Sequence, residues 1–177
     1  AGFKPAGDLI LDRLSESQKE QVQNQAERQA QINEEEDATL RELYHKQEQV
    51  RARMQKKMTD AMANAGMFND MNEIAGMSPD IESTYQLADL DLQIEQRKLQ
   101  IELEQLTKAG ASYADKLPVQ RKLNCIPGQR QLWLKYRNDV SALRKRYKNP
   151  DTDPDYREKS SRLLLQVNEQ VQKNCQH

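Results

Sequence analysis

The sequence predicts an all-α protein, folded as an elongated bundle of three to four helices with a long N-terminal helix and a C-terminal helical hairpin closed by a disulfide. Glycine and proline are absent from residues 8–65, which leaves room for one long uninterrupted helix. No segment has the period-two alternation of a strand, and no Asn-Gly or Asp-Gly turn occurs. Only 36% of residues are hydrophobic while 31% are charged, which suits narrow apolar stripes on helices better than a layered α/β core.

The first helical run changes character along its length. From residue 40 onward, side chains that can face a neighbouring helix recur with an eleven-residue period, which is close to a straight helix with one seam. They are Leu40, Leu43, Gln47, Val50, Met54, Met58, Ala61 and Ala65. Between residues 15 and 37 the row thins to Val22, Ala26, Ala30 and Ile32 among Gln, Glu and Arg. We therefore expect residues 1–37 to form a polar helical arm that buries little and offers a surface to a partner.

Residues 79–109 are predicted to form the central helix. Ser78 is a suitable N-cap, Pro79 fits the first helical position, and Gly110 is placed to end the helix. Its apolar residues form two neighbouring rows. One row contains Tyr85, Ala88, Leu92, Leu99, Leu103 and Leu106, and the other contains Leu87, Leu90, Ile94 and Ile101. Two rows need packing partners on two sides, so we expect residues 38–109 to form an antiparallel pair of long helices joined by a methionine-rich turn.

Residues 110–177 are predicted to form a connector followed by a helical hairpin. The connector, residues 110–128, is rich in helix-breaking residues. The first arm has a heptad row of Trp133, Tyr136, Val140, Leu143 and Tyr147, in which we expect the tryptophan to be a core residue. Asn149-Pro150 ends this arm, and Asp153 caps the second arm. A link this short means that two arms of about 20 residues each run antiparallel.

The two cysteines, Cys125 and Cys175, lie at the two free ends of this predicted hairpin. Arms of about 20 residues are each about 30 Å long, so the second arm returns one cysteine to the other. A disulfide between them would close a loop of about 50 residues and add roughly 4 kcal/mol in the chain-entropy model. The alternative is two free thiols in a reducing cytosol. We expect the disulfide, and with it the periplasm or the cell exterior; the start Ala1-Gly2-Phe3, without Met, also fits a cleaved export signal.

All the methionines fall in one segment of the chain. They are Met54, Met58, Met62, Met67, Met71 and Met77. Three interpretations are open: an adaptable surface for a partner, a thioether site for Cu(I), or side chains that fill gaps at a turn. No cofactor is expected, and no zinc site, because the two cysteines are far apart in sequence and the two histidines, His45 and His177, are remote from each other.

Charge is segregated along the chain although its sum is only −1. Residues 61–120 carry ten acidic and four basic residues, whereas residues 121–177 carry thirteen basic and six acidic ones. Arg144, Lys145 and Arg146 are therefore candidates for binding an anionic partner. The alternative is that the basic arm lies along the acidic central helix and neutralises it. Nucleic acid is not an expected partner, because no recognisable reading module is present.

The sequence argues against an enzyme and against a membrane-spanning protein. It has no Gly-rich phosphate loop, no G-x-S-x-G turn and no H-E-x-x-H motif. Carboxylates that cluster in residues 34–37 would be solvated on an exposed helix, whereas catalysis needs a partly dry site. No segment has the ~20 consecutive apolar residues that cross a bilayer. A small-molecule ligand is not expected.

Two resemblances narrow the functional class. Residues 129–137, Gln-Arg-Gln-Leu-Trp-Leu-Lys-Tyr-Arg, are similar to the Gln/Trp/Arg helix of bacterial lysozyme-inhibitor-like periplasmic domains. The long Gln-rich helices after a small-residue start resemble minor pilus subunits of conjugative secretion systems. Because the polar arm and the methionine-rich turn bury too little to be explained by folding alone, we predict a non-enzymatic, exported interaction or structural protein of the bacterial cell envelope, such as a component of a secretion, conjugation or pilus assembly. Its partners would be proteins, a second copy included. The alternatives are a periplasmic methionine-based copper binder and a small helical inhibitor or binder of an anionic or cell-wall-directed target.

Overall fold

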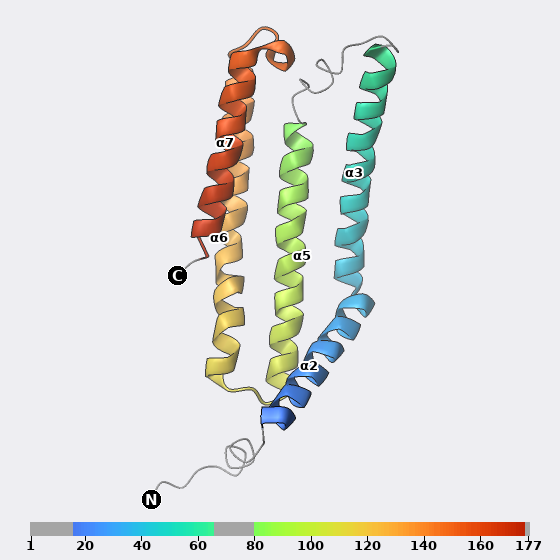
Figure 1. Ribbon diagram of the computed structural model, residues 1–177, viewed down its shortest axis with the longest axis vertical. Helices are drawn as coiled ribbons and strands as arrows, with labels where there is room; N and C mark the ends of the chain where they lie inside the picture. Colours follow the sequence, from blue (N-terminus) through green and yellow to red (C-terminus); the bar gives the residue numbers. More distant parts are fainter. Residues whose placement is uncertain (1–15, 66–79, 176–177) are drawn as a thin grey trace, which may run out of the picture.

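The computed structural model describes residues 16–65 and 80–175 (Figure 1). Its elements are α2 (Glu16–Glu36), α3 (Ala38–Ala65), α5 (Ile81–Lys108), α6 (Tyr113–Arg144), the 3₁₀ turn η1 (Pro150–Thr152) and α7 (Pro154–Lys173). Within these ranges every regular element is helical. The predicted all-α class is therefore confirmed.

Helix α5 is the centre of the bundle, as predicted. Helices α3, α5, α6 and α7 alternate in direction, so each runs antiparallel to the one before it (Figure 1). On one side α5 packs against α6, and α6 in turn packs against α7. On the other side α5 packs against α3 and, near its C-terminal end, against α2.

The two predicted apolar rows of α5 supply two separate cores. The core on the α6 side contains the buried residues Leu92, Leu99, Val119, Ile126, Trp133, Tyr136, Val140, Tyr156 and Val167. The core on the α3 side is smaller and contains Leu40, Leu43, Val50, Leu90, Ile94 and Ile101. Every residue of each predicted row is buried in, or packed against, the core on its own side. The prediction that α5 needs neighbours on two sides is confirmed.

Aromatic side chains fill the core between α6 and α7. The rings of Trp133 and Tyr136 meet edge to face with their centroids 5.6 Å apart, a favoured geometry for aromatic pairs. Val140 and Tyr156 are completely buried, each with an exposed fraction of 0%. The predicted heptad row therefore faces the core, and the expectation that the tryptophan is a core residue is confirmed.

Local signals set most helix ends. Gly110 has a φ of 74°, and the Ala111 N–H donates to Leu106 O over 2.9 Å, which is the Schellman end that glycine favours. The Asp155 N–H donates to the Asp153 side chain over 2.9 Å, so the predicted cap of α7 is confirmed. Ser78 and Pro79 lie outside the described residues. Helix α5 begins at Ile81, and Asp80 rather than Ser78 is its N-cap residue.

The predicted connector over residues 110–128 is wrong, and so are the matched hairpin arms. Ser112 caps α6 by accepting a hydrogen bond from the Asp115 N–H, and the helix then continues through Pro118 and Pro127 for 32 residues. Each proline removes one backbone donor. The buried residues Val119 and Ile126 lie between them on the face that packs against the core, and this packing offsets the loss. Helix α7, with 20 residues, therefore pairs with only part of α6.

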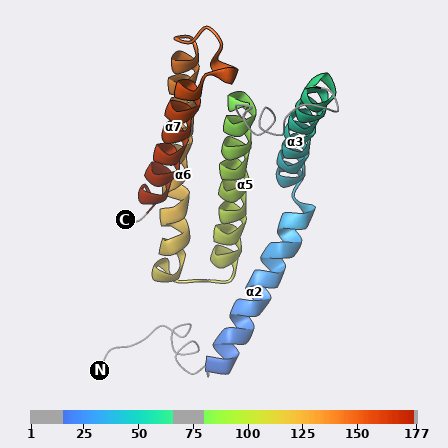
Figure 2. The ribbon, with the colours of Figure 1, turned by 45° about the horizontal axis from the view of Figure 1, so that its top comes forward.

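The predicted long N-terminal helix is divided in two at Asp37. The side chain of this residue accepts a hydrogen bond from the Leu40 N–H over 3.0 Å, which starts a new helix. From this point α2 leans away from the axis of α3, and its N-terminal turns project beyond the turn between α5 and α6 (Figure 2). No residue of α2 is buried. The expectation that this segment buries little is confirmed for residues 16–36, and residues 1–15 lie outside the described part.

Candidate functional site: the cysteine pair and the exposed arm surface

The fold brings Cys125 and Cys175 together, as the sequence predicted. The pair is 2.8 Å apart, and both residues are free thiols rather than a disulfide. Cys125 lies inside α6 and Cys175 lies just after α7, so the meeting point is the side of α6, not the open end of two equal arms.

Polar side chains hold the end of α7 in place beside Cys125. The Gln129 amide donates to Val171 O and to the sulfur of Cys175, each over 3.1 Å. The Asn174 amide donates to Cys125 O over 3.3 Å. A Cβ on Gly128 would come within 2.8 Å of the Asn174 amide nitrogen. Glycine at this position therefore permits the close approach that brings the two cysteines together.

The Cys175 thiol is not an activated nucleophile. Partial burial of the sulfur, together with its hydrogen bond to Cys125, raises the pKa of Cys175 to about 12. The thiolate is the reactive form of cysteine, and a raised pKa keeps the thiol neutral near pH 7. This chemistry fits a structural pair better than a catalytic one.

The three methionines that the structure describes differ in their surroundings. Met54 packs against the core on the α3 side, whereas Met58 and Met62 are 58% and 50% exposed on α3. Met67, Met71 and Met77 lie outside the described residues. The described methionines thus divide between a core contact and an exposed surface.

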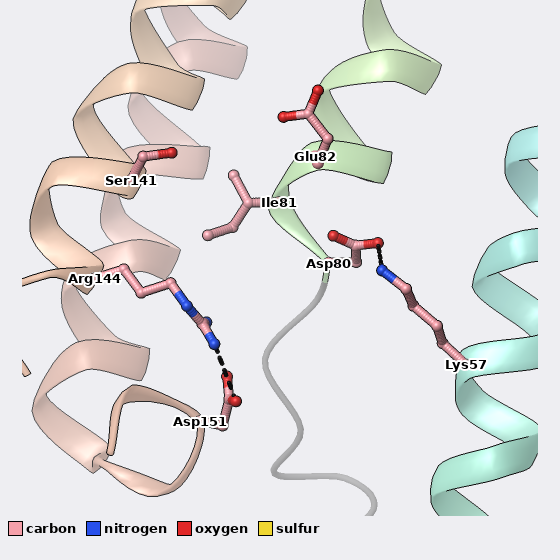
Figure 3. A pocket seen from close by; sticks show the side chains of 7 residues that line it. All are labelled: Lys57, Asp80, Ile81, Glu82, Ser141, Arg144 and Asp151. Carbon is pink, nitrogen blue, oxygen red and sulfur yellow. Dashed lines mark hydrogen bonds and ion pairs between the residues drawn. The ribbon is translucent and has the colours of Figure 1, made fainter. Parts of the chain in front are cut away.

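Arg144 has different surroundings from its neighbours Lys145 and Arg146. The guanidinium of Arg144 is ion-paired with Asp151 over 2.8 Å, while Lys145 and Arg146 are exposed. Arg144 lines an open pocket of about 380 Å³ at one end of the bundle (Figure 3). The lining residues are Lys57, Asp80, Ile81, Glu82, Ser141, Arg144 and Asp151.

Both cations in this pocket are already paired. Lys57 meets Asp80 over 2.6 Å and Arg144 meets Asp151 on the opposite wall (Figure 3). Burial works to raise the pKa of Asp80, but hydrogen bonds from Lys57 and Ser83 outweigh it and the pKa is lowered. The Asp80 carboxylate therefore stays charged and ion-paired with Lys57. Such a pocket links elements of the fold and leaves little charge for an incoming anion.

The basic helix α6 partly neutralises the acidic helix α5. The Arg130 guanidinium makes two hydrogen bonds to Asp89, over 2.7 and 3.1 Å. Arg137 lies 3.7 Å from Glu82 and stacks over the Tyr85 ring at 4.8 Å. These contacts support neutralisation rather than a free basic surface over this part of α6.

Exposed apolar side chains gather on α2 and α3. Seven large apolar side chains are exposed in the described part of the chain, and five of them lie on these two helices. The five are Val22, Ile32, Tyr44, Met58 and Met62. We call the outer faces of α2 and α3 that carry these five residues the arm surface. Exposed apolar side chains of this kind make the two helices candidates for a protein–protein contact.

Sequence reasoning missed the ion pair that positions the arm surface. The Arg97 guanidinium on α5 donates twice to Asp37, over 2.8 and 3.1 Å. The hydrogen bond from Arg97, the Leu40 N–H and the nearby positive charges lower the pKa of Asp37 against the opposing effect of burial. The two residues are 60 positions apart, and no motif links them. The capping ability of Asp37 was the one available signal.

Comparisons with protein-family models, with curated proteins and with solved structures found no match for this chain. None of the described helices is long and apolar enough to span a bilayer. Among the described residues, no three His, Cys, Asp or Glu side chains gather into a group that could hold a metal ion. Function is therefore inferred from the geometry of the chain itself.

Proposed function

We propose that this chain is a non-enzymatic interaction protein that is exported to the bacterial cell envelope and docks to a protein partner through the arm surface. One observation carries the proposal. Helix α2 is 21 residues long and has no buried residue. A component of a secretion, conjugation or pilus assembly is the kind of protein that this arrangement fits.

Folding alone gives little reason for α2 to be helical. The half-buried residues of α2 are small or polar: Ala26, Ala30, Asn33 and Glu34. A side-chain hydrogen bond between α2 and α5 joins Asn33 and Gln105 over 3.3 Å. Most helical stability in proteins comes from packing of an apolar face. A partner on the outer face of α2 would supply that packing.

The cysteine pair supports the proposed location. In the envelope, an oxidant such as a thiol–disulfide oxidoreductase would accept two electrons from Cys125 and Cys175, and the two thiols would lose two protons as the S–S bond forms. The bond would pin the end of α7 to α6 where Gln129 and Asn174 already hold it. Disulfides persist in such oxidising compartments.

The observations favour this proposal over the other two candidates. A Cu(I) site needs several thioether sulfurs on one ion, but Met54 packs against the core while Met58 and Met62 are exposed. An anionic target would meet Arg144 already paired with Asp151. On the arm surface the Tyr44 ring lies 5.9 Å from the Lys98 ammonium of α5, while Val22, Ile32, Met58 and Met62 expose their aliphatic side chains.

The test is to delete residues 16–36 while keeping Asp37, which caps α3. Complexes that contain the chain in extracts of its native source should then lose their partner, as measured by native gel electrophoresis. The bundle should keep its helical circular dichroism and cooperative unfolding. A control variant with Tyr113→Gln and Leu165→Gln removes exposed apolar side chains elsewhere and should leave the complexes intact. Complexes unchanged by the deletion would contradict the proposed docking role.

A further inference from the structure

We propose that the partner on the arm surface is a second copy of this chain, with α2 of each copy lying antiparallel along α3 of the other. The inference rests on the proposed docking function and names the occupant of the same surface. A two-fold arrangement of this kind makes two equal contacts, because each copy offers one α2 and one α3.

Each helix of the arm surface has an exposed row with the spacing of a helix–helix seam. On α2 the row is Val22, Gln25, Gln29, Ile32 and Glu36, and on α3 it is Tyr44, Glu48, Arg51, Gln55, Met58 and Met62. All of these residues are exposed. Steps of alternating three and four residues are the pattern by which two helices pack knobs into holes. The rows contain both apolar and polar residues, so the predicted contact is reversible rather than obligate.

These rows lie beside the faces that pack on α5, and the α3 row meets α5 at Tyr44, whose ring is 5.9 Å from the Lys98 ammonium. On α2 the inward face carries the half-buried residues Ala26, Ala30 and Asn33. On α3 the inward face carries the buried residues Leu43, Gln47 and Val50. A second copy can therefore bind the exposed rows while the bundle of the first copy stays as it is.

The two rows match when one of them is reversed. Read forward from Val22, the α2 row advances by three, four, three and four residues, and the α3 row read backward from Met58 advances by the same steps. This register places Val22 opposite Met58 and Gln25 opposite Gln55. The α3 row read forward from Glu48 advances by the same steps, so spacing sets the register of an antiparallel pair while charge sets the orientation.

Net charge favours the same orientation. Helix α2 has six acidic and two basic residues, a net charge of −4, and α3 has six basic and three acidic residues, a net charge of +3. No ion pair joins a glutamate of α2 to another described residue. A parallel pair would place each helix beside another of its own sign, whereas the antiparallel pair places the acidic helix beside the basic one. The attraction is long-range and screened by salt.

The first experiment measures the oligomeric state of the full chain by sedimentation velocity over a range of concentrations. A monomer–dimer equilibrium is expected, and raising the salt concentration from about 0.05 to 0.5 M should weaken it several-fold. The variant Val22→Gln, Ile32→Gln, Met58→Gln should weaken it at least tenfold. Glutamine is a good helix former, so the helices are kept. Leu165→Gln, on an exposed residue of α7, should change the dissociation constant less than twofold.

The second experiment tests the register. A benzophenone amino acid replaces Gln25, and this chain is mixed with an isotope-labelled copy of the wild-type chain. Photo-crosslinks are expected in labelled peptides around Gln55. Crosslinks to the partner's α2 would overturn the antiparallel arrangement. A chain that stays monomeric at about 200 μM, yet still loses a native complex when residues 16–36 are deleted, would overturn the second copy as partner and leave the docking function standing. A chain that stays monomeric and keeps its native complexes after the deletion would overturn both the second copy as partner and the docking function.

Discussion

The two sides of α5 differ in how completely they are filled. On the α6 side, aromatic residues such as Trp133 and Tyr156 pack into a core that continues into α7. On the α3 side, the buried row consists of smaller residues and ends near Met54, and α2 adds no buried residue. The first side buries most of its apolar groups within the chain, whereas the second leaves several apolar groups on α2 and α3 exposed.

A carboxylate–arginine pair fixes each side of α5. Arg130 of α6 binds Asp89 over 2.7 Å, and Arg97 of α5 binds Asp37, at the start of α3, over 2.8 Å. Both pairs are made by two hydrogen bonds, which gives direction as well as attraction. The Arg97–Asp37 pair therefore orients the joint between α2 and α3, in addition to the smaller core beneath α3. That combination suits a surface that must be presented rather than buried.

The largest expected effect lies on the filled side. Trp133→Ala removes a buried ring and should lower the free energy of unfolding by about 3–5 kcal/mol. Met58→Ala, at an exposed position, should change it by less than about 0.5 kcal/mol. Urea unfolding of both variants at a protein concentration that keeps the chain monomeric gives the comparison. Equal losses would mean that the two sides do not differ as described.

Oxidation of the cysteine pair should increase the difference in stability between the two sides of α5. Closing the loop between Cys125 and Cys175 should stabilise the α6–α7 side by roughly 4 kcal/mol in the chain-entropy model. The measurement is the urea midpoint of oxidised and reduced wild-type chain, with Cys125→Ser as the control that should not respond to the reductant. A midpoint that is independent of oxidation would argue against a stabilising bond.

A smaller effect is expected at the joint between α2 and α3. Asp37→Asn removes the charge that binds Arg97 and should cost about 1 kcal/mol near pH 7, because the pair is only partly buried. The pKa of Asp37 is lowered in the folded chain, so its contribution is present above the unfolded pKa of about 3.9 and is lost as the pH falls through the folded value. The difference between the wild type and the variant should therefore shrink as the pH falls below the unfolded pKa and vanish once the pH is below the lowered folded pKa. A difference that persists there would assign the effect to something other than charge.

The parts of the fold that depend on local signals could be predicted from the sequence. The spacing of Leu92 and Leu99 against that of Leu90 and Ile94 predicted the two faces of α5, because helical periodicity reports directly which residues share a face. Asp153 and Gly110 predicted helix ends because capping also depends on the local sequence. Pro118 and Pro127 led to the wrong prediction of a connector, because a proline weakens a helix locally. The packing of Val119 and Ile126 against the core is a tertiary effect, which residue spacing alone does not reveal.

The candidate site was only partly accessible to the same reasoning. The meeting of Cys125 and Cys175 was predicted because hairpin geometry constrains both, although the arms are unequal. The contact of Gln129 with Cys175 and that of Arg97 with Asp37 join distant parts of the chain through side-chain hydrogen bonds. Any exposed glutamine or arginine has the same local sequence signature, so these contacts needed the fold.

Amide hydrogen exchange at several protein concentrations tests the central claim most directly, because it reports the protection of each helix separately. In dilute solution, α5 and α6 should be strongly protected and α2 should exchange almost as fast as an unstructured peptide. As the concentration rises, protection should increase in α2 and in the exposed row of α3, and stay constant in α6 and α7. If α2 is as protected as α6 in dilute solution and concentration changes nothing, then α2 is stabilised by its own bundle and the arm surface is not a docking site.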